Sequence, residues 1–280
     1  AQSLRDIGWD VLLWPVDKFG HIKLDCLEEM LSPPTKIVSI ILGQSEIGTI
    51  QPVSLVAKEC KIRNIYCHSD ATQVLSQGLF DFNELGVSSL SASAHKFRGP
   101  KGIGLLIIDQ EYKDSLTAIQ GGGQQEFNYR SGTESVALVH GMYIALENIN
   151  LKSNFIDNNL IFPTTKISSM TKDLKNHLST IKGLTFTGHP SIRLPNHISC
   201  LICSKNYQPV DGRRLVRELS KYGVYISSGS ACSSHHSKNS HILKAIGTDS
   251  RLLRSGLRIS LGNWLKDLDT LSLTDLISST

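Results

Sequence analysis

The chain has 280 residues, of which 40% are hydrophobic and 19% charged, a composition typical of a globular protein and not of a disordered one. Basic residues (29) barely exceed acidic ones (25) and form no dense block, so nucleic acid is not an expected partner. No apolar run reaches the roughly 18–20 residues that a membrane span needs. The first residues form no secretory or transit signal and lack an initiator methionine, so we expect the chain to begin within a longer protein.

The six cysteines are irregularly spaced and do not form the pattern of a disulfide framework. This favours a reducing compartment, and we predict a cytoplasmic protein. Cys200 and Cys203 form a C-x-x-C pair within an apolar, alternating run. In a strand, residues i and i+3 point to opposite faces, so the pair is expected to be structural, and no metal site is predicted.

In the first half of the chain, predicted strands alternate with predicted helices. Helices are expected at 24–31, 53–63 and 135–151, and strands at 8–16, 36–42, 65–68 and 103–108. The last of these strands is nearly all apolar and is expected to be buried. A glycine-rich loop is expected at 120–133. This succession is typical of a mainly parallel sheet with crossover helices, in a large domain over residues 1–150.

The second half has a different pattern. After an irregular polar stretch at 153–163, helices are expected at 164–181 and 211–223, and short strands at 184–187, 197–203 and 224–226. Their irregular alternation predicts a smaller α+β domain over residues 151–280.

Lys96 stands between two apolar segments, directly after His95 and just before the turn Gly99-Pro100. A buried lysine is costly unless its ammonium is paired or neutralised, and an imine with an aldehyde cofactor such as pyridoxal phosphate (PLP) neutralises it. The alternative is a solvated lysine beside a turn, which is the more common situation for this residue type.

Asp70 lies at the carboxyl end of a predicted parallel strand, the edge at which open α/β sheets bind ligands. A carboxylate there could keep a pyridine nitrogen protonated, with Gln73 near enough to donate to the ring hydroxyl. The alternative is an aspartate that caps the following helix.

Cys232 lies in a loop of small residues that follows a predicted strand, with His235 and His236 nearby. Such a loop could carry an accessible nucleophile that moves toward its target. The alternative is an incidental surface cysteine.

Arg258 lies inside an apolar strand, where it needs a partner: a substrate carboxylate or a structural ion pair. Thr133 ends the glycine-rich loop, in which hydroxyls and backbone amides could bind a phosphate.

In this order and spacing, the motifs resemble those of the PLP-dependent cysteine desulfurases, which belong to the class V aminotransferase-like family. The matching segments are Glu46-Ile47-Gly48 with Gln51-Pro52, His68 to Gln73, Ser93 to Gly102, Gly121–Gly123 with Arg130 to Thr133, Ser228 to Cys232, and Arg258 to Gly262. The segment around Cys232 is similar to the branch that serves general iron–sulfur assembly. The resemblance implies the PLP-dependent transferase fold type I: an α/β large domain with a mainly parallel sheet, a small C-terminal domain, and a homodimer with shared active sites.

The resemblance also implies residue roles. Lys96 would bind the cofactor as an imine and shuttle a proton, Asp70 would hold the pyridinium, and Gln73 would contact the phenolic oxygen. Ser93 and His95 would bind the cofactor phosphate, and Thr133 would serve the neighbouring subunit. Arg258 would bind the carboxylate of L-cysteine. Cys232 would take its sulfur as a persulfide, release alanine, and pass the sulfur to an acceptor or iron–sulfur scaffold protein.

The sequence departs from the family pattern at two places. The chain begins after the region in which the family has a phosphate-binding turn and a histidine that stacks on the cofactor, so we expect these 280 residues alone to bind PLP weakly. Gln44-Ser45 stands where the family usually has two asparagines, and Ser45 would take the place of the one that meets the cofactor and substrate. The alternatives are a selenocysteine lyase or another enzyme of this family, and an inactive protein that only dimerises or docks.

Overall fold

The computed structural model describes residues 1–149, 154–157, 160–163, 166–229, 239–262, 265 and 269–279. Contacts between residues group the chain into two compact units. Unit 1 comprises Ala1–Thr35, Ser45–Ile50 and Ser169–Thr280, and unit 2 comprises Lys36–Gln44 and Gln51–Ser168. The chain therefore crosses between the units several times. The division into domains 1–150 and 151–280 stays a prediction.

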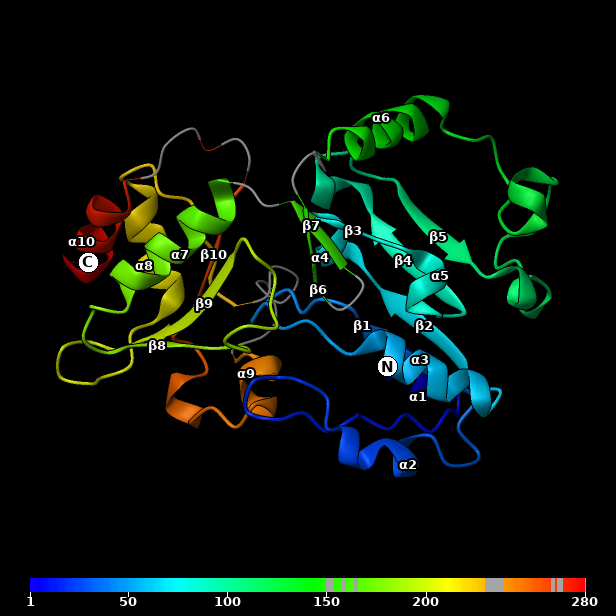
Figure 1. Ribbon diagram of the computed structural model, residues 1–280, viewed down its shortest axis with the longest axis horizontal. Helices are drawn as coiled ribbons and strands as arrows, with labels where there is room; N and C mark the ends of the chain where they lie inside the picture. Colours follow the sequence, from blue (N-terminus) through cyan, green and yellow to red (C-terminus); the bar gives the residue numbers. More distant parts are fainter. Residues whose placement is uncertain are drawn as a thin grey trace. The chain divides into compact units, whose positions relative to one another are not determined.

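Unit 2 is built on a four-stranded sheet in the order β1 (Ile37–Ile41), β2 (Tyr66–Asp70), β4 (Ser89–Ser93) and β5 (Gly104–Ile108) (Figure 1). The first three strands run parallel and β5 is antiparallel to β4. Helix α3 (Val53–Ile62) connects β1 to β2 and buries Val53, Val56, Ala57 and Cys60. The prediction of strands alternating with a crossover helix is confirmed for this part of the chain.

Strand β5 forms where it was predicted, but the expectation that it is buried is wrong. Leu106 is 54% exposed and Ile107 37% exposed. In the described sheet β5 pairs only with β4, so much of its surface stays uncovered. Apolar composition predicts a strand, but it does not tell on how many sides the strand is covered.

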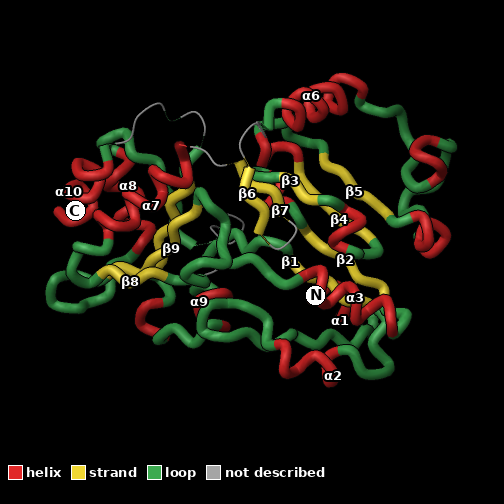
Figure 2. Tube along the Cα trace, in the orientation of Figure 1, coloured by secondary structure: helices red, strands yellow, loops and turns green. Residues whose placement is uncertain are grey.

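Unit 2 also contains further helices and 3-10 turns. They are α4 (Thr72–Leu75), α5 (Phe82–Leu85), η2 (Ala94–Phe97), η3 (Gln110–Ser115), η4 (Gln125–Asn128) and α6 (Val136–Glu147). A second, antiparallel sheet has the order β3 (Leu79–Phe80), β7 (Leu160–Pro163) and β6 (Asn154–Asp157) (Figure 2). The prediction of an irregular stretch at 153–163 is therefore wrong for its described residues, 154–157 and 160–163. Pairing with the distant β3 organises this segment, and local composition does not reveal it.

Unit 1 holds a three-stranded antiparallel sheet in the order β10 (Gly256–Ser260), β9 (His197–Ile202) and β8 (Leu184–Phe186). All six residues of β9, the central strand, are buried. The other elements of the C-terminal segment are α7 (Lys166–Leu178), α8 (Gly212–Ser220), α9 (His241–Ala245), η6 (Ser250–Leu252) and α10 (Thr270–Ser279). The N-terminal segment contributes α1 (Gln2–Asp6), η1 (Leu24–Cys26) and α2 (Leu27–Met30).

The predicted helices form with somewhat shorter ends, whereas two predicted strands do not form. In 8–16, only Val16 makes an isolated bridge, to Ile22. After α8, the backbone of Ser227 pairs with Arg258, but 224–226 is not a strand. Both segments are apolar enough to be strands but lack the neighbouring ladder that a strand requires. Within the described ranges, no helix is both long and apolar enough to span a membrane.

Candidate active site

Lys96 lies on η2, a single 3-10 turn that follows directly after β4. The turn is anchored by Ala94 (0% exposed) and Phe97 (4% exposed), which pack in a hydrophobic cluster with Leu75 and Ala92. Because these two anchors point into the core, the residues between them, His95 and Lys96, are exposed. The cost of burying an unpaired ammonium, on which the sequence argument relied, therefore does not arise here.

The residues after Lys96 explain why the turn ends where it does. Arg98 adopts the left-handed conformation with φ 69° and closes the turn. The Gly99 amide then donates to the carbonyl of Ala94 at 2.9 Å. A Cβ at Gly99 would lie 2.9 Å from the Ala94 Cβ, so only glycine fits this close approach. Arg98 and Gly99 thus end η2 and fix the direction in which the chain leaves it.

Asp70 is the last residue of β2 and is paired in register with Ser91 of the neighbouring parallel strand β4. Two residues further along β4 is Ser93, and η2 with Lys96 follows. The carboxylate, the hydroxyl and the amine therefore all belong to the same carboxyl edge of unit 2's sheet. One carboxylate oxygen, Oδ1, accepts the Thr72 amide at 2.9 Å, so the local contact that the capping alternative anticipated is also present.

Gln73 and Thr133 are the other two predicted cofactor-binding residues. Gln73 lies on the short helix α4, one turn after Asp70, and is half-buried. Thr133 is exposed at the end of the glycine-rich loop. That loop is held locally by Ser131, whose hydroxyl donates to the Gly123 carbonyl at 3.0 Å.

His68, two residues before Asp70 on β2, contacts side chains of both neighbouring strands. The sequence did not reveal these contacts. Its Nδ1 lies 2.9 Å from the Ser39 hydroxyl on β1, and its Nε2 lies 3.1 Å from the Ser91 hydroxyl on β4. Burial lowers the pKa of His68, and the nearby Asp70 carboxylate partly opposes this. The alternation of a strand puts residues 68 and 70 on one face, which was the available signal.

In unit 1, Arg258 contacts the main chain of Ser45, and the substrate-binding roles of both residues stay predictions. Arg258 lies on β10, and its backbone exchanges two hydrogen bonds with Ser227, at 2.7 and 3.0 Å. Its Nη1 donates to the Ser45 carbonyl oxygen at 3.0 Å. The contact therefore uses the main chain of Ser45, so it does not depend on the residue type that stands there.

The side chains of Arg193 and His197 hold the Ser45–Ile50 segment against β9. The Nε2 of His197 lies 3.1 Å from the Ser45 carbonyl, and Arg193 donates to the carbonyls of Ile47 and His197 at 3.3 and 3.0 Å. Burial lowers the pKa of Arg193 to about 10. Neither residue was singled out from the sequence, because their partners lie far away along the chain.

Cys232 lies outside the described residues, as do its neighbours from 230 to 238. Its convergence with Lys96 on one cofactor stays a prediction. Of the C-x-x-C pair, Cys200 is buried and Cys203 half-buried. Burial raises the pKa of the Cys200 thiol to about 12.

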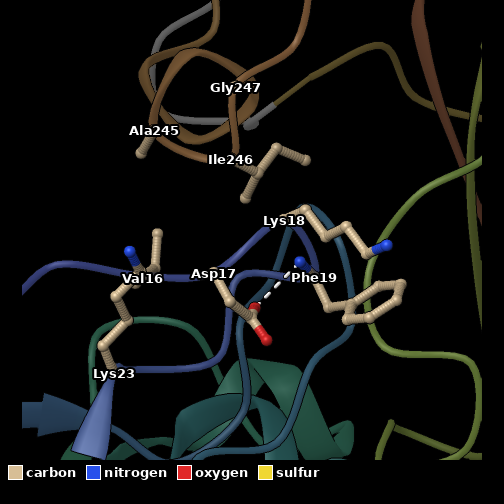
Figure 3. A pocket seen from close by; sticks show the side chains of 8 residues that line it. All are labelled: Val16, Asp17, Lys18, Phe19, Lys23, Ala245, Ile246 and Gly247. Carbon is tan, nitrogen blue, oxygen red and sulfur yellow. Dashed lines mark hydrogen bonds between the residues drawn. The ribbon is translucent and has the colours of Figure 1, made fainter. Parts of the chain in front are cut away.

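A separate hollow in unit 1 contains none of the predicted site residues (Figure 3). Its wall is formed by the turn Val16 to Phe19, by Lys23, and by Ala245 to Gly247. The turn is closed by the Asp17 carboxylate, which accepts the Phe19 amide at 2.8 Å (Figure 3). The lining offers aliphatic groups, two lysines, the Phe19 ring and the Asp17 carboxylate, which already accepts the Phe19 amide, so we assign it no role.

Residues 1–270 match the family described as aminotransferase class V. The chain therefore belongs to the class V aminotransferase family.

Individual relatives are cysteine desulfurases. The cysteine desulfurase IscS of Dictyoglomus turgidum is 36% identical over 262 residues, covering 94% of this chain and 63% of that protein. The human cysteine desulfurase is 33% identical over 265 residues, covering 94% of this chain and 55% of that protein. The chain therefore spans little more than half the length of these curated relatives.

Solved structures agree with this assignment. A NifS-like protein superposes with a TM-score of 0.81 at 30% identity, covering 99% of this chain and 70% of that one. The structure titled "SspA in complex with cysteine" gives a TM-score of 0.74 at 28% identity, covering 93% and 68%. The predicted fold class, an α/β fold of the PLP-dependent type I kind, is confirmed.

The chemistry of the unit 2 edge fits the PLP that the family implies. A carboxylate suits a pyridinium, an amine suits an aldehyde, and a hydroxyl and an imidazole suit a phosphate. Asp70, Lys96, Ser93 and His95 supply these groups from the ends of adjacent strands. The exposed position of Lys96 leaves its amine accessible to an incoming aldehyde.

Proposed function

We propose that this protein is a PLP-dependent cysteine desulfurase that converts L-cysteine to L-alanine and holds the sulfur as a persulfide on Cys232. The main support for the proposal is that Asp70, Ser93 and Lys96 all lie at the carboxyl edge of the parallel strands β2 and β4. Further support comes from Arg258, fixed on the Ser45 carbonyl, and from relatives that are cysteine desulfurases.

In this function the chain's own residues bind and orient. Arg258 binds the substrate α-carboxylate with its guanidinium donors. Asp70 fixes the cofactor nitrogen, Gln73 contacts the ring oxygen, and Ser93 and His95 hold the phosphate, with Thr133 completing that site in a homodimer. When bound, PLP supplies an electron sink for bonds at the substrate Cα. Lys96 attaches the cofactor and then carries a proton at Nζ.

Cys232 carries the sulfur transfer. Its thiolate attacks the substrate sulfur, so that an S–S bond forms and the substrate Cβ–S bond breaks. The electron pair of the broken bond stays with the carbon skeleton, which is protonated to alanine. The net reaction converts one thiol and one cysteine into one persulfide and one alanine. The persulfide sulfur then passes to an acceptor or an iron–sulfur scaffold protein, in a compartment that we predict to be the cytoplasm.

The test combines PLP and L-cysteine with the purified protein and measures alanine together with the mass of the Cys232 peptide. We expect alanine, and one added sulfur atom on Cys232. Cys232→Ala should abolish both, whereas the matched control Cys203→Ala should retain both. Lys96→Ala should abolish alanine as well.

Other outcomes separate the alternatives. A Cys232→Ala protein that still releases alanine from selenocysteine would identify a selenocysteine lyase. A keto acid in place of alanine would identify an aminotransferase. A protein that takes up PLP but turns over no amino acid would be a dimerising or docking protein.

A further inference from the structure

Helix α8 of unit 1 has an apolar inner face and a basic outer face (Figure 1). Leu215 and Leu219 are 2% and 0% exposed and anchor the helix in the core. Side chains three and four residues apart are neighbours on a helix surface, so the exposed cations line up on the opposite side. This basic stripe of α8 consists of the exposed side chains Arg213, Arg214, Arg217 and Lys221.

Acidic groups balance the stripe only in part. Glu218 lies beside it and pairs with Lys221 at 2.5 Å, with side chains 39% and 64% exposed. The Lys221 hydrogen bond lowers the pKa of Glu218, and the charges of Lys221, Arg214 and Arg217 act in the same direction. Asp211, the N-cap of α8, pairs instead with Arg254 at 2.5 Å. The helix and its caps therefore carry more positive than negative charge on the outer face.

The stripe begins next to the segment that leads to Cys232. A Cβ on Gly212, the first residue of α8, would lie 3.3 Å from the Ser228 Cβ. Cys232 follows four residues later, at most about 14 Å away in a fully extended chain. An average protein interface covers about 800 Å² on each partner, a patch about 30 Å wide. A protein bound on the stripe is therefore within reach of the Cys232 thiol.

The composition around the stripe favours a protein as the partner. Protein interfaces are enriched in arginine and tyrosine, and Tyr222 and Tyr225, just after the helix, are 67% and 84% exposed. Glu218 would repel a continuous row of phosphates, whereas a protein surface can place a donor opposite it. The positive charge of the stripe is complementary to carboxylates on that surface.

We propose that the basic stripe of α8 is the docking surface for an acidic protein that takes the sulfur from Cys232. The inference rests on the proposed function, because it assumes a persulfide on Cys232. A thiol of the partner attacks the outer sulfur of that persulfide, so that a new S–S bond forms on the partner. The bond between the outer sulfur and the Cys232 Sγ breaks, and the Cys232 thiolate takes up the proton that the partner thiol lost.

The test uses two synthetic helical peptides on the full chain loaded with PLP. Each peptide has one cysteine; one carries glutamates at i, i+4 spacing, and the other carries glutamines at the same positions. Kd is measured by fluorescence anisotropy, and the glutamate peptide should bind roughly tenfold more tightly. Arg214→Glu combined with Arg217→Glu should remove this preference, because two attractive contacts become repulsive. Lys58→Glu combined with Lys113→Glu reverses two exposed charges of unit 2 and should keep it.

Two results would overturn the docking surface. One is a charge-reversed stripe that still prefers the glutamate peptide. If the charge-reversed protein does not fold, Arg214→Gln combined with Arg217→Gln takes its place, and an unchanged preference there has the same meaning. The other is an oligothymidine that binds more tightly than the glutamate peptide and loses affinity in the same variant, which would identify a nucleic-acid surface.

A second readout separates this inference from the proposed function. After addition of L-cysteine, the glutamate peptide should gain one sulfur atom by mass, and the glutamine peptide much less. If Cys232 gains no sulfur, the proposed function fails, and with it the role of the partner as sulfur acceptor. If Cys232 gains sulfur but both peptides receive it equally, only the docking inference fails.

Discussion

His197 shows how one buried side chain links the fold to pH. Its Nε2 donates to the Ser45 carbonyl, and a Cβ on Gly48 would lie 2.6 Å from its Nδ1. Burial, with Arg193 nearby, lowers the pKa of His197 from 6.5 to about 3. The folded protein therefore holds this imidazole uncharged over the whole neutral and mildly acidic range.

The sign of the resulting pH dependence follows from linkage. Between pH 6.5 and about 3, the unfolded chain binds a proton at His197 that the folded chain does not bind. This contribution to stability is fully present above pH 6.5 and is lost as the pH falls toward about 3. We expect the free energy of unfolding to drop between about pH 7.5 and about pH 4.5, with roughly 1–3 kcal/mol of the drop coming from this residue.

His197→Gln tests this expectation in urea unfolding at both pH values. The variant should be less stable at neutral pH, but its stability should fall less on acidification. The control is His140→Gln, which changes an exposed histidine of α6 and should keep the full pH dependence. An equal drop in His197→Gln and in the unchanged protein would contradict the assignment.

Lys96 gives a second prediction for a single residue. Borohydride reduction after addition of PLP should leave a stable label on the Lys96 peptide, because reduction converts an imine to a secondary amine that stays attached, whereas unattached cofactor is reduced to an alcohol that leaves no label. Lys96→Ala should lose the label. Lys101→Ala removes another exposed lysine, five residues further along the chain, and should keep the label. A label distributed over several lysines in the unchanged protein would speak against a dedicated site.

Gly104, at the start of β5, matters for the element that carries Lys96. A Cβ there would lie 2.6 Å from the Ala92 carbonyl oxygen on β4, and the next residues of β4 lead into η2. Gly104→Ala should therefore push the two strands apart and lower the free energy of unfolding by about 1–3 kcal/mol. Denaturant unfolding measures the loss, and PLP labelling of Lys96 should decline with it.

The matched control is Gly121→Ala, because nothing lies within 4 Å of the added Cβ at that position. It should change stability by a few tenths of a kcal/mol at most, in the range of surface substitutions. Equal effects of the two substitutions would show that the close contact at Gly104 relaxes freely.

Elements whose signal is local were predictable from the sequence. β1 is a β-branched run between Pro34 and Gly43, and α3 has an apolar face at helical spacing after Pro52, so both formed as expected. β6 and β7 were missed because β7 pairs with β3, about eighty residues earlier in the chain, and no local pattern encodes that. The segment 8–16 was overpredicted for the converse reason: it is apolar but finds no ladder to join.

The candidate site also has a part that was predictable from the sequence and a part that was not. Lys96, Asp70 and Ser93 lie in recognisable sequence motifs, and β2 and β4 bring them to one edge of the sheet. Arg258 donates to the Ser45 carbonyl, and the Ser45–Ile50 segment is held in turn by Arg193 and His197, about 150 residues further along the chain. Contacts of this kind depend on the tertiary fold, and a sequence pattern gives residue types without their partners.

At the scale of the whole molecule, unit 2 leaves apolar surface uncovered. Helix α6 has no buried residue, although its sequence is largely apolar, and Val139 and Ile144 are 46% and 42% exposed. Leu106 and Ile107 on β5 are similarly exposed. Apolar groups of this kind on an edge strand and on a neighbouring helix favour association with further polypeptide.

We therefore expect the 280-residue chain to self-associate at micromolar concentration through unit 2, as measured by sedimentation velocity. Leu106→Lys should reduce the associated fraction, since a charge on an edge strand opposes pairing with another strand. Leu12→Lys is the matched control: Leu12 is 66% exposed but lies in unit 1, outside any strand. If association depended only on total exposed apolar area, both substitutions would act alike. A selective effect of Leu106→Lys would instead locate the contact at the free edge of the sheet that carries the candidate site.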